Sequence, residues 1–195
     1  MPTTFTRDAP VRLGVIVGST REGRFGPTVA NWFVQHAEQR GDLEVDVIDL
    51  TDFDVPSQIG RTGTAAMAPF RECVGLADAF AVVTPEYNHG YPAVLKQAID
   101  FVNAEWHAKP VGFVSYGGIS GGLRAVEQLR LVFAELHAVT IRDGVSLHFG
   151  WNLFDEAGSM HEPENPVVAV KVMLDELTWF ARALRTARSE HPYGS

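Results

Sequence analysis

The chain has 195 residues, enough for one domain with its own hydrophobic core. Hydrophobic residues make up 46% of it and charged residues 21%, which is the balance of a globular protein in water. A formal net charge of −8 argues against nucleic acid as a partner, because phosphate backbones are bound by basic surfaces. Any anion that the chain binds must therefore be held locally, by backbone N–H groups and a few arginines.

The cysteine content and the apolar runs narrow the class of protein further. The single cysteine, Cys73, excludes an internal disulfide bond and a CxxC metal or redox pair, and we expect it to be a buried thiol without a chemical role. No run approaches the ~20 apolar residues that span a bilayer. The first eight residues lack the apolar core of a signal peptide. These features predict a cytoplasmic protein without a membrane partner.

Apolar runs alternate with amphipathic stretches from one end of the chain to the other. The run at 13–17 is short, rich in β-branched residues and followed by Gly18, as in a strand buried on both faces of a parallel sheet. Apolar residues then recur at spacings of three and four from Val29 to His36, which predicts a helix of about four turns that Gly41 terminates. The same alternation continues along the chain. Further strands are predicted at 43–49, 79–84, 110–115 and about 139–148, and further helices at about 65–77, 92–102, 120–137 and 166–187.

The order of these elements predicts the architecture. No internal repeat and no break in composition marks a domain boundary, so we expect one domain over 1–195, with flexible tails at 1–10 and 188–195. The Gly/Thr/Ser-rich stretch at 57–64 is predicted to be a loop. Five strands that alternate with five helices indicate an α/β fold, with a parallel sheet covered by helices on both faces. Ligands of such sheets bind beyond the carboxyl ends of the strands, where the strand order reverses.

The loop after the first strand, residues 18–26, leads from a buried strand into a helix. Its glycine and small hydroxyl residues let backbone N–H groups converge on an anion, and the helix N-terminus adds a favourable dipole. The loop has neither the Gly-Lys-Ser/Thr of a P-loop nor the G-x-G-x-x-G of a dinucleotide fingerprint. We predict that it binds an anion. The alternative is an ordinary strand-to-helix turn with surface arginines.

The loop after the third strand, residues 84–92, combines two prolines with aromatic and amide side chains. Tyr87 could cover a planar ligand while backbone N–H groups meet the polar edge of that ligand. The alternative is a rigid turn whose tyrosines pack on their neighbours. His89 could donate a proton, but a lone histidine in a loop is more often a hydrogen-bonding residue, so we assign no catalytic side chain.

The loop after the fourth strand, residues 115–122, carries two Gly-Gly pairs. Glycine lets a backbone approach a flat ligand without a Cβ in the way, whereas a merely flexible loop is the alternative. Because all three loops lie at strand ends around one crevice, together they predict a site for a flat cofactor that carries a phosphate. The seven histidines are scattered without i, i+4 pairing, so we expect no metal site.

Three motifs in these loops are recognisable: Val-Gly-Ser-Thr-Arg at 17–21, Thr-Pro-Glu-Tyr-Asn-His-Gly at 84–90 and Ser-Tyr-Gly-Gly at 115–118. Pro92, Leu-Lys at 95–96 and Ala-Ile-Asp at 98–100 follow the second of them. Over residues 12–148 the chain resembles the NADPH-dependent FMN reductase family, a flavodoxin-like group that includes bacterial quinone and chromate reductases. The resemblance implies a flavodoxin-like three-layer sandwich with a five-stranded parallel sheet in the order 2-1-3-4-5.

The resemblance also implies a function. FMN would be the cofactor, NADPH or NADH the source of electrons, and a quinone, an azo compound, free flavin or a metal oxyanion the acceptor. Hydride would pass to the flavin N5, and the acceptor would follow in the same space, with ping-pong kinetics and no acid–base side chain. A non-enzymatic electron carrier of flavodoxin type is the alternative. A receiver-type signalling domain would need acidic residues after the first strand, and residues 18–21 contain none.

The residues that the resemblance assigns to FMN lie in the three loops. Many relatives carry Ser and Asn where this chain has Arg24 and Gly26, so we expect Arg24 to supply charge in their place. The phosphate is expected at Gly18, Ser19, Thr20, Arg21, Arg24, Phe25 and Gly26, the ring and ribityl chain along Pro85, Glu86, Tyr87 and Asn88, and the other side of the ring at Ser115, Tyr116, Gly117 and Gly118.

Two stretches bear on assembly and on the acceptor. Apolar residues occupy several faces in the stretches 94–106 and 123–136, which include most of two predicted helices, and this favours a dimer seam over two core helices. The resemblance also implies a homodimer or a tetramer of dimers. The region that contains Trp151, Phe154 and His161 lies outside the resemblance, and either caps the acceptor site or packs on the core.

Overall fold

The computed structural model describes residues 9–58, 60, 65–161 and 164–194. Much of the predicted loop at 57–64 and of the predicted tail at 1–10 lies outside these residues. Among the helices that are described, none is long and apolar enough to cross a membrane.

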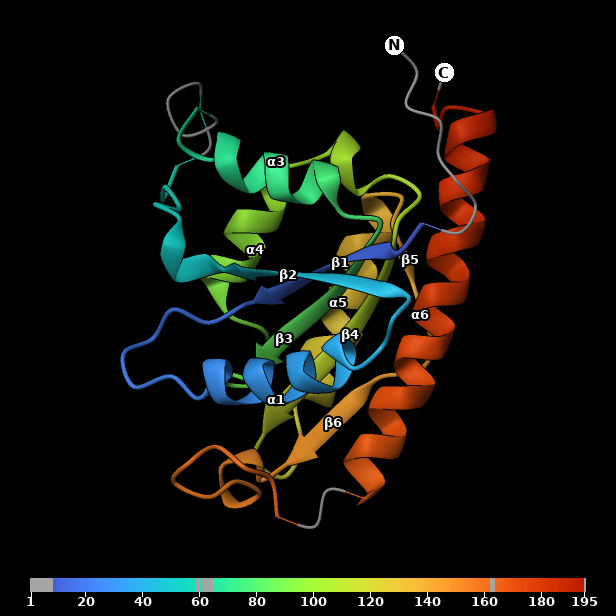
Figure 1. Cartoon of the computed structure of the whole chain (residues 1–195). Coiled ribbons are helices and arrows are strands. Elements are labelled where there is room, and N and C mark those ends of the chain that lie inside the picture. Colours follow the sequence, from blue (N-terminus) through green and yellow to red (C-terminus); the bar gives the residue numbers. More distant parts are fainter. Residues whose placement is uncertain (1–8, 59, 61–64, 162–163, 195) are drawn as a thin grey trace.

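The centre of the molecule is a parallel sheet (Figure 1). Its strands follow the order β2-β1-β3-β4-β5, and a sixth strand, β6, also pairs with β4. This confirms the flavodoxin-like fold and the predicted strand order. The strands are β1 (Val11–Val17), β2 (Leu43–Asp49), β3 (Ala79–Pro85), β4 (Pro110–Gly117), β5 (Val139–Thr140) and β6 (Val145–His148).

The predicted fifth strand at 139–148 is wrong as a continuous element, because residues 141–144 interrupt it. The interruption is held by side chains from two helices. Backbone N–H groups of Arg142 and Asp143 donate to the Glu176 carboxylate, and the Arg130 guanidinium donates to the Ile141 and Arg142 carbonyl groups. These bonds replace ladder bonds to β4, so that β5 and β6 pair with β4 at separate places.

The helices agree with the predicted ones within a few residues at each end, and α6 continues to Glu190, into the predicted tail at 188–195. Three short 3₁₀ turns join other elements. The helices are α1 (Gly26–Glu38), α3 (Ala68–Leu76), α4 (Ala93–Asp100), α5 (Leu123–Glu135) and α6 (Glu164–Glu190), and the 3₁₀ turns are η1 (Leu50–Asp52), η2 (Ala104–Trp106) and η3 (Gly150–Asn152).

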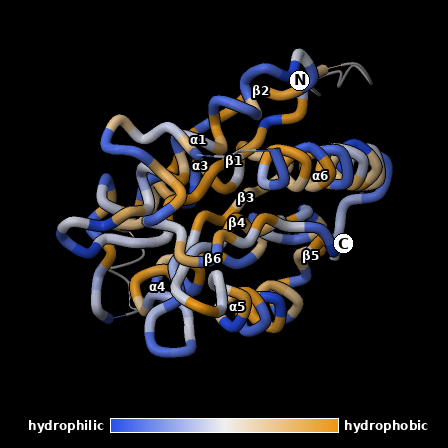
Figure 2. The backbone as a smooth tube through the Cα atoms, turned by 90° about the horizontal axis from the view of Figure 1, so that it is seen from below, coloured by the Kyte–Doolittle hydropathy of each residue, from blue (hydrophilic) through white to orange (hydrophobic). Residues whose placement is uncertain are grey.

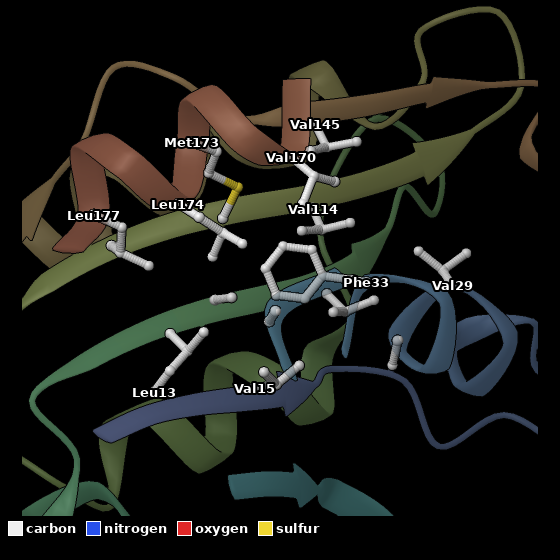
Figure 3. Packing of buried hydrophobic residues seen from close by; sticks show 14 of the residues in the cluster. Leu13, Val15, Val29, Phe33, Val114, Val145, Val170, Met173, Leu174 and Leu177 are labelled. Carbon is white, nitrogen blue, oxygen red and sulfur yellow. The ribbon is translucent and has the colours of Figure 1, made fainter. Parts of the chain in front are cut away.

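Helices cover both faces of the sheet, because the central strands are apolar on both sides. In β3, Ala81 and Val83 belong to the core under α1 and α6, whereas Phe80 and Val82 belong to the core under α3, α4 and α5. Figure 2 shows β3 and β4 as hydrophobic segments in the middle of the molecule. In Figure 3, the Phe33 ring of α1 lies between residues of β1 and residues of α6.

The two stretches predicted to form a dimer seam differ in how much of their apolar surface is exposed. In the stretch 94–106, Leu95, Ile99 and Trp106 are fully buried within one copy of the chain, which accounts for their apolar character without a partner. Helix α5, in contrast, leaves the Leu123 side chain 50% exposed and the Leu131 side chain 75% exposed.

Cys73 lies in α3 as a free thiol that is half-buried. Burial raises the pKa of this thiol, so it stays protonated at neutral pH.

Candidate functional site

Three loops meet at the carboxyl edge of the sheet. Residues 18–25 follow β1, residues 86–92 follow β3, and residues 118–122 follow β4 (Figure 1). The strand order reverses at β1, since β2 lies on one side of it and β3 on the other. The site is therefore where an open α/β sheet places its ligands.

The loop 18–25 is buried where it leaves β1 and becomes exposed at Thr20. The Gly18 N–H donates to the Val83 carbonyl, so the loop starts as an extension of the sheet. Ser19 is fully buried, whereas Thr20 and Arg21 are exposed. No side chain caps the first turn of α1, and none of its residues is acidic. The N-terminus of α1 thus presents backbone donors and a favourable dipole to an anion.

Gly26 explains how closely the loop packs. A Cβ at this position would lie 2.7 Å from Ser19 Oγ and 3.0 Å from Tyr116 Oη. Both contacts are shorter than van der Waals distance. A side chain at position 26 would therefore force the Ser19 hydroxyl or the Tyr116 ring to shift.

The two arginines of the first loop have different surroundings. In the part of the chain that the structure describes, the exposed Arg21 guanidinium makes no hydrogen bond and no ion pair. The Arg24 guanidinium donates to both Asp49 carboxylate oxygens at 2.6 and 2.7 Å, and to the Ser19 carbonyl at 2.6 Å. Arg24 thus ties the loop to the end of β2, and a direct contact between Arg24 and a phosphate stays a prediction.

Asp49 is the residue that pattern reasoning missed. Burial acts to raise the pKa of Asp49, but hydrogen bonds from Arg24 and Thr51 outweigh it and hold this pKa below its usual range. The carboxylate therefore stays ionised and neutralises Arg24. The predicted strand order could have pointed to Asp49, because this residue ends β2, the strand that neighbours β1.

Tyr116 links the first loop to the third. It is 5% exposed, and its ring packs edge-to-face on Phe25 at 5.9 Å between centroids. Its hydroxyl lies 3.4 Å from Ser19 Oγ. Burial raises the pKa of Tyr116 to about 12, so the hydroxyl keeps its proton and remains a hydrogen-bond donor.

The second loop contains a two-residue turn. Tyr87 and Gly90 exchange backbone hydrogen bonds of 2.8 and 3.1 Å, and the residues between them have φ values of 49° for Asn88 and 76° for His89. Positive φ at both central positions is what a type I′ turn requires. The turn is braced by Gln128, which donates to the His89 carbonyl at 2.7 Å. It therefore presents Tyr87 and Asn88 on a fixed backbone.

Glu86 turns its carboxylate away from the first loop. One oxygen accepts the Arg124 backbone N–H at the start of α5, and the other accepts from the Arg124 guanidinium at 3.0 Å. Burial acts to raise the pKa of Glu86, but hydrogen bonds from Ser120 and Arg124 keep it below the usual value. The Glu86 backbone N–H is also used, because it donates to the Tyr116 carbonyl.

The third loop is folded back on its own strand. Ser115 Oγ donates to the Gly121 carbonyl at 2.8 Å, and Gly122 has a φ of 88°. A Cβ on Gly122 would lie 2.6 Å from Ser115 Cβ, so a glycine is needed there. Around Gly118, in contrast, the space is open except for the Trp151 ring.

The structure brings some of the predicted residues into contact with one another. Ser19, Phe25, Gly26 and Tyr116 are in contact, and Pro85 pairs with Tyr116 in the sheet. Among the described residues, no three His, Cys, Asp or Glu side chains are placed to hold a metal ion.

A parallel sheet in this order, covered by helices on both faces, defines the flavodoxin-like class of α/β domains. The solved structure of FerB, a flavoenzyme NAD(P)H:(acceptor) oxidoreductase from Paracoccus denitrificans, shares this fold. Its TM-score is 0.72 at 20% identity, over 87% of this chain and 97% of FerB.

The chain belongs to the NADPH-dependent FMN reductase family, whose model matches residues 11–152. It is therefore an oxidoreductase of this family, with FMN and NAD(P)H as the cofactors that the family name specifies. This confirms the resemblance seen in the sequence.

One curated relative extends this match over most of the chain. The NAD(P)H-dependent FMN reductase LOT6 of Saccharomyces cerevisiae is 32% identical over 199 residues, which is 92% of this chain and 100% of LOT6. The corresponding protein of Schizosaccharomyces pombe is 37% identical over 118 residues, 55% of this chain and 58% of that relative, less than two thirds of its length. A quinone reductase of Pseudomonas putida is 27% identical over 164 residues, 79% of this chain and 87% of the relative.

Proposed function

We propose that the chain transfers electrons from NAD(P)H to small aromatic acceptors, quinones above all, with FMN bound between the three loops. One observation carries the proposal. Among the described residues, the exposed Arg21 in the loop before α1 has no ion-pair partner, the first turn of α1 has no side-chain cap, and Tyr116 connects this loop to the glycine loop after β4. The names of the P. putida quinone reductase and of FerB support a small-molecule acceptor.

The residues present fit FMN. The loop 18–26 and Arg21 would hold the phosphate, which carries close to two negative charges at neutral pH. The cradle has no room for a larger residue at position 26, and its buried Ser19 hydroxyl faces the same corner. When bound, FMN supplies the redox chemistry, because its ring accepts a hydride and passes on two electrons.

The residues of the other two loops would position the flavin ring. The type I′ turn with Tyr87 and Asn88 and the backbone of Gly117 and Gly118 would border the ring on two sides. No acid or base is needed, since a quinone that gains two electrons takes its two protons from NAD(P)H and from solvent. Nicotinamide and acceptor would use the same face in turn, so we expect ping-pong kinetics with parallel double-reciprocal lines.

The test is anaerobic mixing of protein, FMN and NADPH, followed by addition of a quinone. We expect the flavin absorbance to bleach and to return when the quinone is added, with one hydroquinone formed for each NADPH oxidised. If the flavin binds but does not bleach with either NADPH or NADH, the chain is a flavodoxin-type electron carrier.

We also propose a cytoplasmic homodimer, or a tetramer of such dimers. The support for the dimer is helix α5, which leaves Leu123 and Leu131 exposed on its outer face. A face of this kind is often covered by a second copy of the chain.

A further inference from the structure

Two large aromatic side chains stay exposed at the edge of the candidate site. Phe149 is 47% exposed and Trp151 53% exposed, and their rings pack edge-to-face with 6.3 Å between centroids. Ile119, in the neighbouring loop, is 77% exposed. A single exposed apolar residue is ordinary, but three large ones from two joined loops form a patch of the kind that binds ligands.

The two loops that carry this patch are tied together. The Phe149 N–H donates to the Gly118 carbonyl at 3.1 Å, and His148 Nδ1 lies 2.9 Å from the Ile119 carbonyl oxygen. The loop that follows β6, at the bottom of Figure 1, is therefore hydrogen-bonded to the glycine loop that follows β4.

The backbone that presents the aromatic rings is fixed. Phe149 has a φ of 48°, an outlier for a bulky residue that is found where the surroundings impose it. The Asn152 N–H donates to the Phe149 carbonyl at 2.8 Å, and the Leu153 N–H to the Gly150 carbonyl at 3.0 Å. The next residue, Phe154, is buried against Phe25. The backbone that carries the exposed rings is thus held in place before a ligand binds.

The indole of Trp151 stands beside the open glycine of the site. Its Cη2 atom lies 3.8 Å from the point that a Cβ on Gly118 would occupy. On the other side, a Cβ on Gly150 would lie 3.2 Å from Tyr116 Cβ, so the η3 turn rests directly on Tyr116. The patch is therefore continuous with the segment 115–118 that is expected along the flavin ring.

We infer that Trp151, with Phe149 and Ile119, forms a wall that binds uncharged planar aromatic acceptors, two-ring quinones above all, next to the flavin. This inference rests on the proposed function. Trp151 takes no part in electron transfer. It offers an indole face and edge to the acceptor ring while two electrons from NAD(P)H and two protons convert the quinone to its hydroquinone. The net charge of −8 further favours an uncharged acceptor over an anionic one.

The experiment compares Trp151→Ala with Trp179→Ala in FMN-loaded protein. Trp179 is a matched control, because it is 66% exposed and packs edge-to-face on Phe180 in α6. The acceptors are 1,4-naphthoquinone, which is planar and uncharged, and ferricyanide, which has no ring. In Trp151→Ala we expect the ratio of kcat/KM for naphthoquinone to kcat/KM for ferricyanide to fall about 5- to 20-fold, mostly through KM. Trp151→Phe should restore most of the ratio, and Trp179→Ala should leave it unchanged.

A binding measurement without NADPH gives an independent readout. Naphthoquinone should quench the tryptophan fluorescence of the wild type in a saturable way. The saturable part should be lost in Trp151→Ala and kept in Trp179→Ala. If Trp151→Ala leaves the ratio of the two kcat/KM values or the saturable quenching unchanged, the wall is rejected. The proposed reductase function is not affected by that result. Equal losses with both acceptors also reject the wall. A wild type that oxidises neither NADPH nor NADH with either acceptor rejects the proposed function itself, and the wall with it.

Discussion

Arg21 and Arg24 lie three residues apart in the loop after β1, yet only one of them is neutralised by a carboxylate. Asp49 pairs with Arg24 through two hydrogen bonds, and the exposed Arg21 has no such partner among the described residues. We therefore propose that Arg21 supplies the positive charge for the FMN phosphate, while Arg24 keeps the loop in place.

Replacing Arg21 by alanine should therefore weaken FMN binding and leave the fold intact. One charge-assisted hydrogen bond contributes about 1.5–3 kcal/mol, so we expect the Kd to rise about 10- to 100-fold. Quenching of flavin fluorescence on titration measures this Kd. Arg142→Ala is the control, because the Arg142 side chain is 88% exposed and lies in the turn before β6. An unchanged Kd in Arg21→Ala would remove the first loop from the site.

A methyl group at position 26 tests how closely the same corner is packed. In Gly26→Ala the new Cβ would meet Ser19 Oγ and Tyr116 Oη at 2.7 and 3.0 Å, and overpacking of this kind costs about 1–3 kcal/mol. We expect a lower midpoint of urea unfolding and weaker FMN binding. Gly41→Ala is the matched control, because a Cβ on Gly41 would have no atom within 4 Å. Equal midpoints for the two variants would contradict the packing described here.

At the scale of elements, Lys109 shows how a helix end is held from another part of the chain. It lies just before β4, is 6% exposed, and donates from Nζ to the Val74 and Gly75 carbonyl groups at the end of α3. A cation at a helix C-terminus is favourable, but burial, together with the neighbouring Arg188, lowers the pKa of Lys109 to about 8.

This shift predicts a dependence of stability on pH. The ordinary lysine pKa is about 10.4, so between pH 8 and about 10.4 the unfolded chain binds more protons at Lys109 than the folded one. Folding stability from this group therefore rises with pH in that window. Urea unfolding at pH 7.5, 9 and 10 should show the wild type gaining stability relative to Lys109→Met. Lys171→Met, at a lysine that is 74% exposed, serves as the control for the loss of one lysine charge. A constant difference for Lys109→Met would be the contrary result.

In the whole molecule, only one of the two surfaces expected to pair with another copy of the chain stays exposed. The large apolar residues of the stretch 94–106 are buried in the core of their own chain, whereas α5 leaves apolar residues exposed on its outer face. If that face is the dimer seam, the wild type should sediment as a species larger than 21.4 kDa, and Leu131→Lys should sediment as the monomer. Leu76→Lys, at a residue 52% exposed on α3, is the control that should leave assembly unchanged. A wild type that is already monomeric would exclude the dimer, and a dimeric Leu131→Lys would exclude the α5 face.

The sequence by itself determined the kinds of elements, their order and the three loops that meet at the strand ends. These signals are local, because apolar periodicity, Gly18 after a buried strand and the motif at 84–90 each lie within about ten residues. Only the tertiary structure decided the partners of the charged and aromatic side chains. Asp49 meets Arg24 across 25 residues, Arg124 meets Glu86 across 38, and Trp151 comes to stand beside Gly118. Such pairings depend on how strands neighbour one another in the sheet, and no local pattern along the chain carries that information.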